Sequence, residues 1–179
     1  MLTTILIIVG LVIVVLAIVI AVQPSTFRIS RSVTVNAPAS AAFAQVNDFR
    51  KWESWSPWEK VDPNTKKTYE GSPSGVGAKY AWAGNRQVGE GRMTILENRP
   101  NELIRIRLEF LKPMKATHMT DFTFAQSGNQ TVVTQSMYGK NNFLAKAMHL
   151  VMNMETMIGP MFEKGLSQLK TVAETGGRQ

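Results

Sequence analysis

The chain has 179 residues, no cysteine, and 20 Lys and Arg against 13 Asp and Glu, which gives a formal net charge of +7 at pH 7. The lack of cysteine excludes disulfides and thiolate metal sites. The basic residues are scattered, without the stripe or motif that nucleic-acid binding needs, so we expect no nucleic-acid partner.

The first element is an unbroken apolar run at the N-terminus. Residues 5–22 carry no charge, and the first charged residue is Arg28. A helix of about 20 residues spans the roughly 30 Å hydrocarbon core of a bilayer, and a lone strand could not satisfy its backbone groups there. The sequence therefore predicts a membrane anchor at 1–23, with the helix at 2–22, and a short linker at 24–26. A cleaved signal peptide is the weaker alternative, because no Lys or Arg precedes the run and Ala21-Val22-Gln23-Pro24 is a poor cleavage site.

Charge next to the apolar run predicts its orientation. Arg28 and Arg31 follow it closely and no basic side chain precedes it. The positive-inside rule then predicts a single-pass protein of the cell inner (cytoplasmic) membrane, with its soluble domain in the cytoplasm. The net positive charge, all of it after residue 27, would also draw the domain toward anionic headgroups, although a solvated surface with net charge is the plainer interpretation.

The soluble part begins with a strand and two short helices. Residues 27–35 alternate between apolar and polar side chains, as a half-buried strand does. Pro38 suits the first turn of a following helix, where a missing N–H costs nothing. Asp48 is a candidate N-cap for a second helix through Trp55, and Pro57 is expected to end it.

Six further strands are predicted in the middle of the chain. They alternate in the same way and are separated by short, turn-forming sequences, at residues 65–70, 77–83, 87–98, 102–111, 115–126 and 130–139. Connections this short favour an antiparallel meander.

The chain closes with a helical region at 142–174. Apolar residues recur at helical spacing on one face, among them Ile158, Phe162, Leu166 and Leu169. Gly159-Pro160 is expected to kink this helix or restart it. Residues 176–179 are predicted to be a flexible tail.

Four segments resemble a known superfamily. They run from Asn47 to Trp58, from Tyr69 to Gly71, from Gly75 to Met93, and from Gly159 to Lys170. Together they resemble the START-like, or SRPBCC, superfamily, which includes polyketide cyclase-like proteins, and in particular a bacterial subgroup with a preceding membrane anchor. The resemblance implies an α+β helix-grip domain at 27–175, with a seven-stranded antiparallel sheet around a long C-terminal helix. It also implies a cavity between sheet and helix where members bind hydrophobic molecules, with no shared catalytic motif.

The side chains expected to line such a cavity are aromatic or thioether groups. They are Trp52, Trp55, Trp58, Tyr80, Trp82, Met93, Phe110, Phe122, Met154, Met157 and Met161. Methionine is flexible and suits varied apolar ligands, but it is equally a common core residue. The tryptophans of segment 52–58 can line the cavity mouth or a headgroup layer, or they can simply pack over the open end of the sheet.

Few residues suggest catalysis. His118 is in phase with Thr120 and Phe122 on a predicted strand, which makes it a candidate acid–base group, although a structural role is favoured because it has no partner at motif spacing. Glu109 is expected to face solvent, and the glycines around Glu90 are expected to permit sheet curvature. No cluster has metal-ligand spacing, so neither metal nor cofactor is expected.

Three functions remain in view. The first is a membrane-tethered binding domain for a hydrophobic or amphipathic small molecule of the lipid or isoprenoid class, with the bilayer as its other partner. The second is a cyclase or dehydratase acting on a hydrophobic substrate, and the third is a protein-interaction module that docks through Trp52, Trp55 and Trp58. We favour binding over catalysis, and the sequence identifies no protein partner.

Overall fold

The computed structural model describes residues 1–176. In chain order its elements are α1 (Leu2–Ala21), β1 (Thr26–Val35), α2 (Ala39–Val46), the 3₁₀ helices η1 (Phe49–Ser54) and η2 (Pro57–Lys60), β2 (Lys66–Gly71), β3 (Ala78–Ala83), β4 (Glu90–Arg99), β5 (Leu103–Lys112), β6 (Ala116–Ser127), β7 (Gln130–Lys140), α3 (Phe143–Val151) and α4 (Met154–Gly176). The predicted tail beyond Gly176, which itself ends α4, lies outside the described residues.

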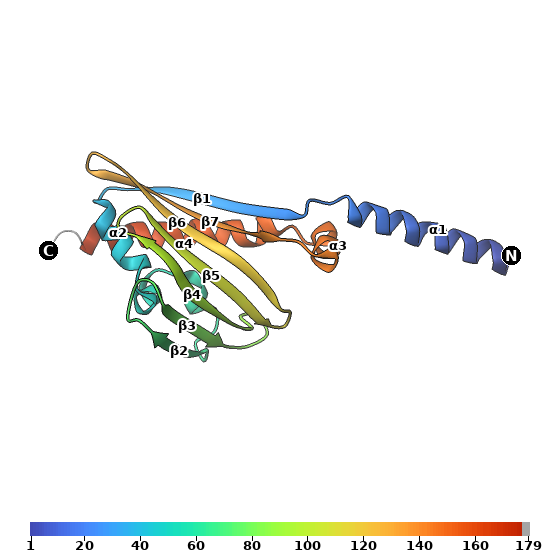
Figure 1. Cartoon of the computed structure of the whole chain (residues 1–179), viewed down its shortest axis with the longest axis horizontal. Helices are drawn as coiled ribbons and strands as arrows, with labels where there is room; N and C mark the ends of the chain where they lie inside the picture. Colours follow the sequence, from blue (N-terminus) through green and yellow to red (C-terminus); the bar gives the residue numbers. More distant parts are fainter. Residues whose placement is uncertain (177–179) are drawn as a thin grey trace.

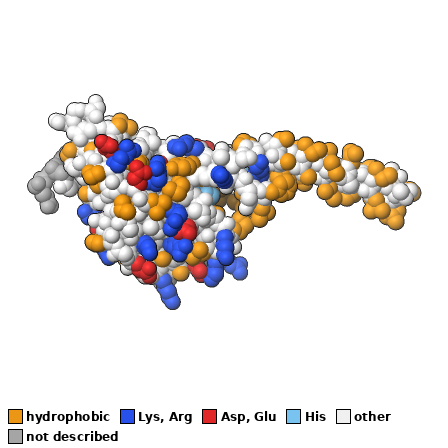
Figure 2. All heavy atoms as spheres, in the orientation of Figure 1, with side chains coloured by type: hydrophobic (Ala, Val, Ile, Leu, Met, Phe, Trp, Pro, Cys, Tyr) orange, Lys and Arg blue, Asp and Glu red, His pale blue; other side chains and the backbone are white. Residues whose placement is uncertain are grey.

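Helix α1 projects from the domain, as Figure 1 shows. Its surface is almost wholly apolar in the space-filling view (Figure 2), and Ile20 is its buried residue. By length and composition it could cross a membrane.

The seven strands form one antiparallel sheet in the order β1-β7-β6-β5-β4-β3-β2. The sheet curves around α4, which runs along its concave face and packs mainly against β1 (Figure 1). The predicted α+β helix-grip fold is confirmed. The strand bounds agree with the sequence pattern to within three residues, because turn-forming sequences separate the strands and alternation is typical of strands with one buried face.

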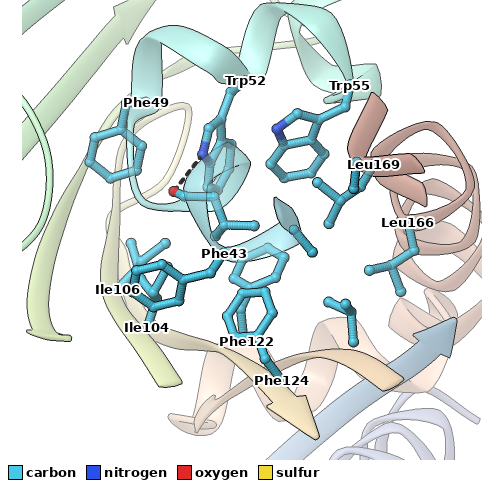
Figure 3. Packing of buried hydrophobic residues seen from close by; sticks show 14 of the residues in the cluster. Phe43, Phe49, Trp52, Trp55, Ile104, Ile106, Phe122, Phe124, Leu166 and Leu169 are labelled. Atoms are coloured by element: carbon cyan, nitrogen blue, oxygen red, sulfur yellow. Dashed lines mark hydrogen bonds between the residues drawn. The ribbon is translucent and has the colours of Figure 1, made fainter. Parts of the chain in front are cut away.

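The main core lies between the sheet, α2, η1 and α4. Figure 3 shows side chains from α2 and η1 meeting side chains from the sheet and from α4. The fully or nearly buried members include Phe43, Phe49, Trp52, Trp55, Ile104, Ile106, Phe122, Phe124, Leu166 and Leu169.

Strand register places several loops at the end of the sheet from which α1 departs. Thr26, the first residue of β1, pairs with Lys140, the last residue of β7. Glu90, the first residue of β4, pairs with Lys112, the last residue of β5. The β3–β4 loop, the β5–β6 loop and the start of β1 therefore share one end. We call it the anchor end, because α1, the helix expected to act as an anchor, leaves the domain there.

The C-terminal helical region restarts at a different place from the one predicted. The break falls between α3 and α4, where the Asn153 side chain accepts hydrogen bonds from the backbone N–H groups of Glu155 (3.0 Å) and Thr156 (3.4 Å). This side-chain cap starts a new helix, and α4 then continues through Pro160. Of the two outcomes expected at Gly159-Pro160, a kink or a restart, the restart does not occur there, because Asn153 caps the new helix six residues earlier.

Two other prolines have structural positions that differ from the predicted ones. Pro38 occupies the cap of α2 instead of its first turn. Pro57 begins η2, a helix that the sequence did not predict. Its fixed backbone angle suits the start of a helical turn, and this places Trp58 and Glu59 beside the sheet. Asp48 caps η1 as predicted, accepting from the Arg50 N–H at 2.9 Å.

Candidate ligand-binding site

A cavity of about 200 Å³ lies between the concave face of the sheet, the start of α4 and the 3₁₀ helices, and it is partly open to solvent. Its walls are mainly aromatic and aliphatic, with a few polar groups. The lining residues are Trp52, Ser56, Trp58, Glu59, Thr65, Tyr80, Trp82, Gln87, Val88, Met93, Leu108, Phe110, Thr120, Gln135, Met137, Ile158 and Phe162.

Three aromatic rings, from Tyr80, Trp82 and Phe110, form one wall. Tyr80 stacks on Trp82 with ring centres 6.0 Å apart, and Tyr69, outside the wall, stacks on Tyr80 at 5.2 Å. Trp82 then meets the edge of Phe110 at 6.1 Å. Gly91 makes this arrangement possible, because any side chain there would overlap the Trp82 ring and the backbone of β5. Close approach to a neighbour is a typical role of glycine in a strand.

The tryptophans of segment 52–58 divide into two kinds. Trp52 and Trp55 are buried. The Trp52 indole N–H donates to the Val46 carbonyl at 3.0 Å (Figure 3), and the Trp55 indole N–H donates to the Gln45 carbonyl at 3.2 Å. Trp58 is 42% exposed and stands at the cavity rim. Trp55 is thus ordinary core, while Trp52 reaches from the core to the cavity wall. The contiguous exposed patch of three indoles that a docking module would use is not formed.

One carboxylate faces the cavity, and it is held by two partners. Glu59, whose side chain is 7% exposed, accepts a hydrogen bond from the Tyr80 hydroxyl at 2.9 Å and pairs with the Lys67 ammonium at 2.7 Å. Lys67 also donates to Glu53 at 2.8 Å. This Glu59–Tyr80–Lys67 group is the charged centre of a mainly apolar pocket.

The group perturbs the ionisation of its members. Burial, followed by the charge and hydrogen bond of Glu59, raises the pKa of the Tyr80 phenol far above its usual value. Burial alone would lower the pKa of Lys67, but its hydrogen bonds to Glu53 and Glu59 outweigh that effect and raise it. Tyr80 is therefore a neutral donor and Lys67 a cation across the physiological range.

His118 lies outside this cavity. Its ring packs edge-on against Phe27 (5.0 Å) and Phe110 (6.0 Å), and the glycine at position 139 leaves room for it. Its buried Nδ1 has no hydrogen-bond partner among residues 1–176. Burial, with a smaller contribution from His149, lowers the pKa of His118. The imidazole shares a face with Thr120, as the alternation predicted, but it is packed among aromatic rings instead of lining the pocket.

The methionines predicted from α4 are not in the cavity wall of the described structure. Met157 is 53% exposed, Met161 is half-buried, and Met154 packs at the edge of a small cluster around Phe162. Ile158 and Phe162 line the cavity from this helix instead. Each is the immediate neighbour of a predicted methionine, and one residue along a helix turns the side chain by about 100°. Helical spacing, which had put Ile158 and Phe162 on the apolar face, predicted the lining residues of α4 better than the choice of methionine did.

Phe122, also predicted to line the cavity, is not in its wall. It is fully buried and packs against Trp52 (5.8 Å) and Trp55 (6.0 Å). Thr120, two residues away on the same face, lines the cavity instead. Of the other predicted residues, Trp52, Trp58, Tyr80, Trp82, Met93 and Phe110 lie in the wall. The sequence analysis did not identify Glu59 as a lining residue, because no sequence pattern predicted η2, the helix that contains it.

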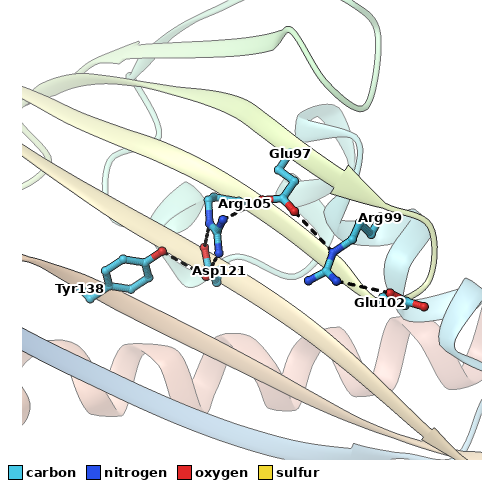
Figure 4. Close-up of polar contacts among 6 residues, drawn as sticks. All are labelled: Glu97, Arg99, Glu102, Arg105, Asp121 and Tyr138. Carbon is cyan, nitrogen blue, oxygen red and sulfur yellow. Dashed lines mark hydrogen bonds and ion pairs between the residues drawn. The ribbon is translucent and has the colours of Figure 1, made fainter.

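The convex face of the sheet carries paired charges. Arg105 donates to both oxygens of Asp121 (3.0 Å each) and to Glu97 (2.7 Å), and the Tyr138 hydroxyl donates to Asp121 at 3.2 Å (Figure 4). Glu109 belongs to the same face and accepts two hydrogen bonds from Arg92, as expected of a carboxylate turned away from the cavity. Within the described residues, no three His, Asp or Glu side chains could hold a metal ion.

Residues 26–174 match the family described as Polyketide cyclase / dehydrase and lipid transport. The chain belongs to this family. Its matched segment begins at β1 and ends near the C-terminus of α4, so α1 precedes the family domain. The resemblance to SRPBCC proteins seen in the sequence is confirmed.

Solved structures with this fold are similar at low sequence identity. A solution structure from Thermobifida fusca is 21% identical with a TM-score of 0.61, covering 83% of this chain and 93% of that one. A protein from Chromobacterium violaceum is 17% identical with a TM-score of 0.59, covering 85% and 99%. The di-domain ARO/CYC StfQ from the steffimycin biosynthetic pathway is 12% identical with a TM-score of 0.58, covering 84% of this chain and 51% of StfQ. No curated protein sequence matches. Identities this low establish the shared fold and leave the ligand open.

Proposed function

We propose that this family member is a membrane-tethered binding domain that holds an apolar or amphipathic small molecule, of the lipid or isoprenoid class, between its sheet and α4. The observation that carries the proposal is the partly open cavity with its aromatic and aliphatic walls and a single charged centre. Pockets of this composition, with a few placed polar groups, are typical small-molecule sites.

The size of the cavity limits what it can enclose. At about 200 Å³ it exceeds the roughly 150 Å³ cavity that accommodates benzene, and it is smaller than the roughly 300–1,000 Å³ of pockets for drug-sized ligands. It therefore suits one ring or a short branched segment, with the rest of a longer ligand emerging past Trp58 and Gln87, the two exposed rim residues.

The charged centre supports an amphipathic ligand. The Glu59 carboxylate can accept a hydrogen bond from a ligand hydroxyl or ammonium, and Thr120 and Gln135 add further polar atoms to the wall. An entirely apolar ligand would leave Glu59 desolvated without added compensation.

Native mass spectrometry of the full chain, released from membranes into detergent, tests this proposal. We expect a co-purifying small molecule that is reduced in Ile158→Trp, where the larger ring fills the cavity. Val132→Trp, on the exposed side of β7 and outside the cavity, is the matched control and should retain the molecule. Equal occupancy in both variants, or none in the unaltered chain, would refute binding at this site.

The same charged centre favours a second candidate, a cyclase or dehydratase. A carboxylate next to a neutral phenol in a largely apolar pocket provides an acceptor and a donor for proton transfer. In that case Glu59→Gln should accumulate an unreacted molecule, heavier by one water if the reaction is a dehydration. The same molecule in both proteins would support binding alone.

The tether and its orientation are part of the proposal. α1 supplies the span by length and composition, and Arg28 and Arg31 after it favour a cytoplasmic domain of an inner-membrane protein. The chain has no cysteine, so Leu96→Cys, exposed on β4, introduces a single reactive thiol. In spheroplasts, a membrane-impermeant maleimide should label it only after lysis. Labelling before lysis would place the domain on the outside, and recovery of the chain in the soluble fraction would refute the tether.

A further inference from the structure

Helix α3 presents an apolar face to the surroundings. Phe143 is 56% exposed, Leu144 is 59% exposed and Leu150 is 40% exposed. Phe143 and Leu150 lie seven residues apart, two helical turns, and so share a face, with Leu144 beside it. Side chains of this size are left in water only singly as a rule, so three on one short helix indicate a contact surface.

The position of α3 shows what this surface meets. The Lys146 ammonium donates to the carbonyl of Ala21, the last residue of α1, at 3.0 Å. The Asn141 N–H, just before α3, donates to the Ser25 carbonyl at 2.8 Å. Figure 1 shows α3 beside the base of α1. If α1 spans a bilayer, α3 lies at the depth where that span emerges.

A second apolar tip lies at the same end of the sheet. In the β5–β6 loop and its flanks, Leu111 is 42% exposed and Met114 is 46% exposed. The pairing of Glu90 with Lys112 and of Thr26 with Lys140 puts this tip at the anchor end.

Basic residues lie within or next to both apolar elements, along the chain or in strand register. They are Arg28, Lys112, Lys115, Lys140 and Lys146. Two carboxylates nearby are already paired, Glu90 with Lys112 (2.8 Å) and Glu155 with Arg31 (2.6 Å). Apolar side chains among lysines, next to a membrane span, are typical of segments that lie in the interface between lipid and water.

We propose that α3 and the tip of the β5–β6 loop form a membrane-docking surface that lies in the phospholipid headgroup layer beside the α1 span. The inference rests on the proposed spanning of α1. It goes further in assigning a fixed face of the domain to the bilayer. That face includes the anchor end of the sheet, where the cavity residues Val88 and Phe110 lie, so an apolar ligand could pass between lipid and cavity over a short path.

Site-directed spin labelling of the full chain tests this. Single cysteines are introduced by Leu144→Cys, Leu150→Cys and Met114→Cys, and the labelled proteins are placed in nanodiscs of phosphatidylcholine and phosphatidylglycerol. Oxygen concentrates in lipid and a charged nickel chelate stays in water, so their relative access to the label reports depth. We expect labels on α3 to lie about 5–10 Å below the headgroup surface and the label at Met114 to lie near the phosphate level.

Two control labels separate this inference from the proposed tether. Val132→Cys, at the opposite end of β7, should be fully accessible to nickel, and Ile13→Cys, in the middle of α1, should be deep in lipid. A buried Ile13 label with α3 labels as water-accessible as Val132 would overturn the docking surface and leave the span intact. An Ile13 label in water would overturn both. Labels on α3 shielded from oxygen and nickel alike would place the face against protein, such as a second copy, and would also overturn the proposal.

Discussion

At the scale of single residues, the charged centre of the cavity is defined by one buried hydrogen bond. The Tyr80 hydroxyl donates to Glu59 at 2.9 Å in a site where both side chains are almost inaccessible to water. Removal of the donor in Tyr80→Phe leaves a desolvated carboxylate with one partner fewer. Hydrogen bonds to charged groups contribute about 1.5–3 kcal/mol, and we expect the free energy of unfolding to fall by that amount in denaturant titrations in detergent.

The adjacent tyrosine provides the control for that measurement. Tyr69 stacks on Tyr80, but the hydrogen bond to Glu59 comes from the Tyr80 hydroxyl and not from that of Tyr69. Tyr69→Phe should therefore change the free energy of unfolding by a few tenths of a kcal/mol at most. Equal losses in the two variants would mean that ring packing, and not the bond to Glu59, stabilises this wall.

The imidazole of His118 predicts a pH dependence of stability. Burial lowers its pKa in the folded protein, whereas the unfolded chain titrates near 6.5. Below that pH the unfolded state binds more protons, so the stabilisation present above pH 6.5 is lost as pH falls through the folded-state pKa. His118→Phe, which keeps a ring among Phe27 and Phe110, should lose this component of acid sensitivity.

Thermal unfolding from pH 7.5 down to pH 5 measures the effect as a difference between the two proteins. Carboxylates that titrate in this range contribute to both and cancel. Above pH 7.5 the difference should be constant, because His118 is neutral in both states there. A difference that stays constant down to pH 5 would show that His118 titrates normally in the fold.

At the scale of elements, the cavity wall formed by β3, β4 and β5 depends on a glycine, Gly91 in β4, which leaves room for the Trp82 ring. A methyl group at Gly91 would overlap the Trp82 indole and the β5 backbone at Glu109. Over-packing of this kind costs about 1–3 kcal/mol, and Gly91→Ala should shift Trp82 out of the wall as well as destabilise the domain. Native mass spectrometry should then show lower ligand occupancy. Gly176→Ala, where no atom lies within 4 Å, is the neutral control.

The same elements show how far the sequence determines the structure. Alternation and turn-forming sequences predicted all seven strands, and the alternation put Phe122 and Thr120 on the cavity face. Alternation could not show that the space next to Phe122 is filled by Trp52 and Trp55, whereas the space next to the smaller Thr120 is part of the cavity. Where a cavity forms along the concave face depends on side chains from distant segments.

Helical segments were harder to predict for a related reason. The rotation of α4 about its axis decides that Ile158 faces the cavity and that Met157 faces outward. That rotation is set by contacts such as Arg31, which pairs with Glu155 and Glu163 and lies over Gly159. Such contacts join residues more than 120 positions apart, so local patterns do not show them.

At the scale of the whole molecule, hydrogen bonds brace the joint between α1 and the domain. The Lys146 bond to Ala21 and the two Asn141 bonds, to the Ser25 carbonyl at 2.8 Å and to the Pro24 carbonyl at 3.2 Å, cross it from the domain side. A lysine at the C-terminus of α1 also complements the helix dipole. The connection between α1 and β1 is only four residues long, and these hydrogen bonds fix it to the domain. We therefore expect the domain to keep one orientation relative to α1.

Rigidity of this joint is measurable as the spread of one distance. Spin labels at Val19→Cys in α1 and Leu96→Cys on β4 should give a narrow distance distribution by double electron–electron resonance in nanodiscs. Insertion of about ten Gly-Ser residues between Pro24 and Ser25 frees the chain as a flexible coil and should broaden it. The same insertion between Gly128 and Asn129, in a distant turn, should leave it narrow. A distribution already broad in the uninserted chain would contradict the bracing, and the cavity would then have no fixed direction relative to the bilayer.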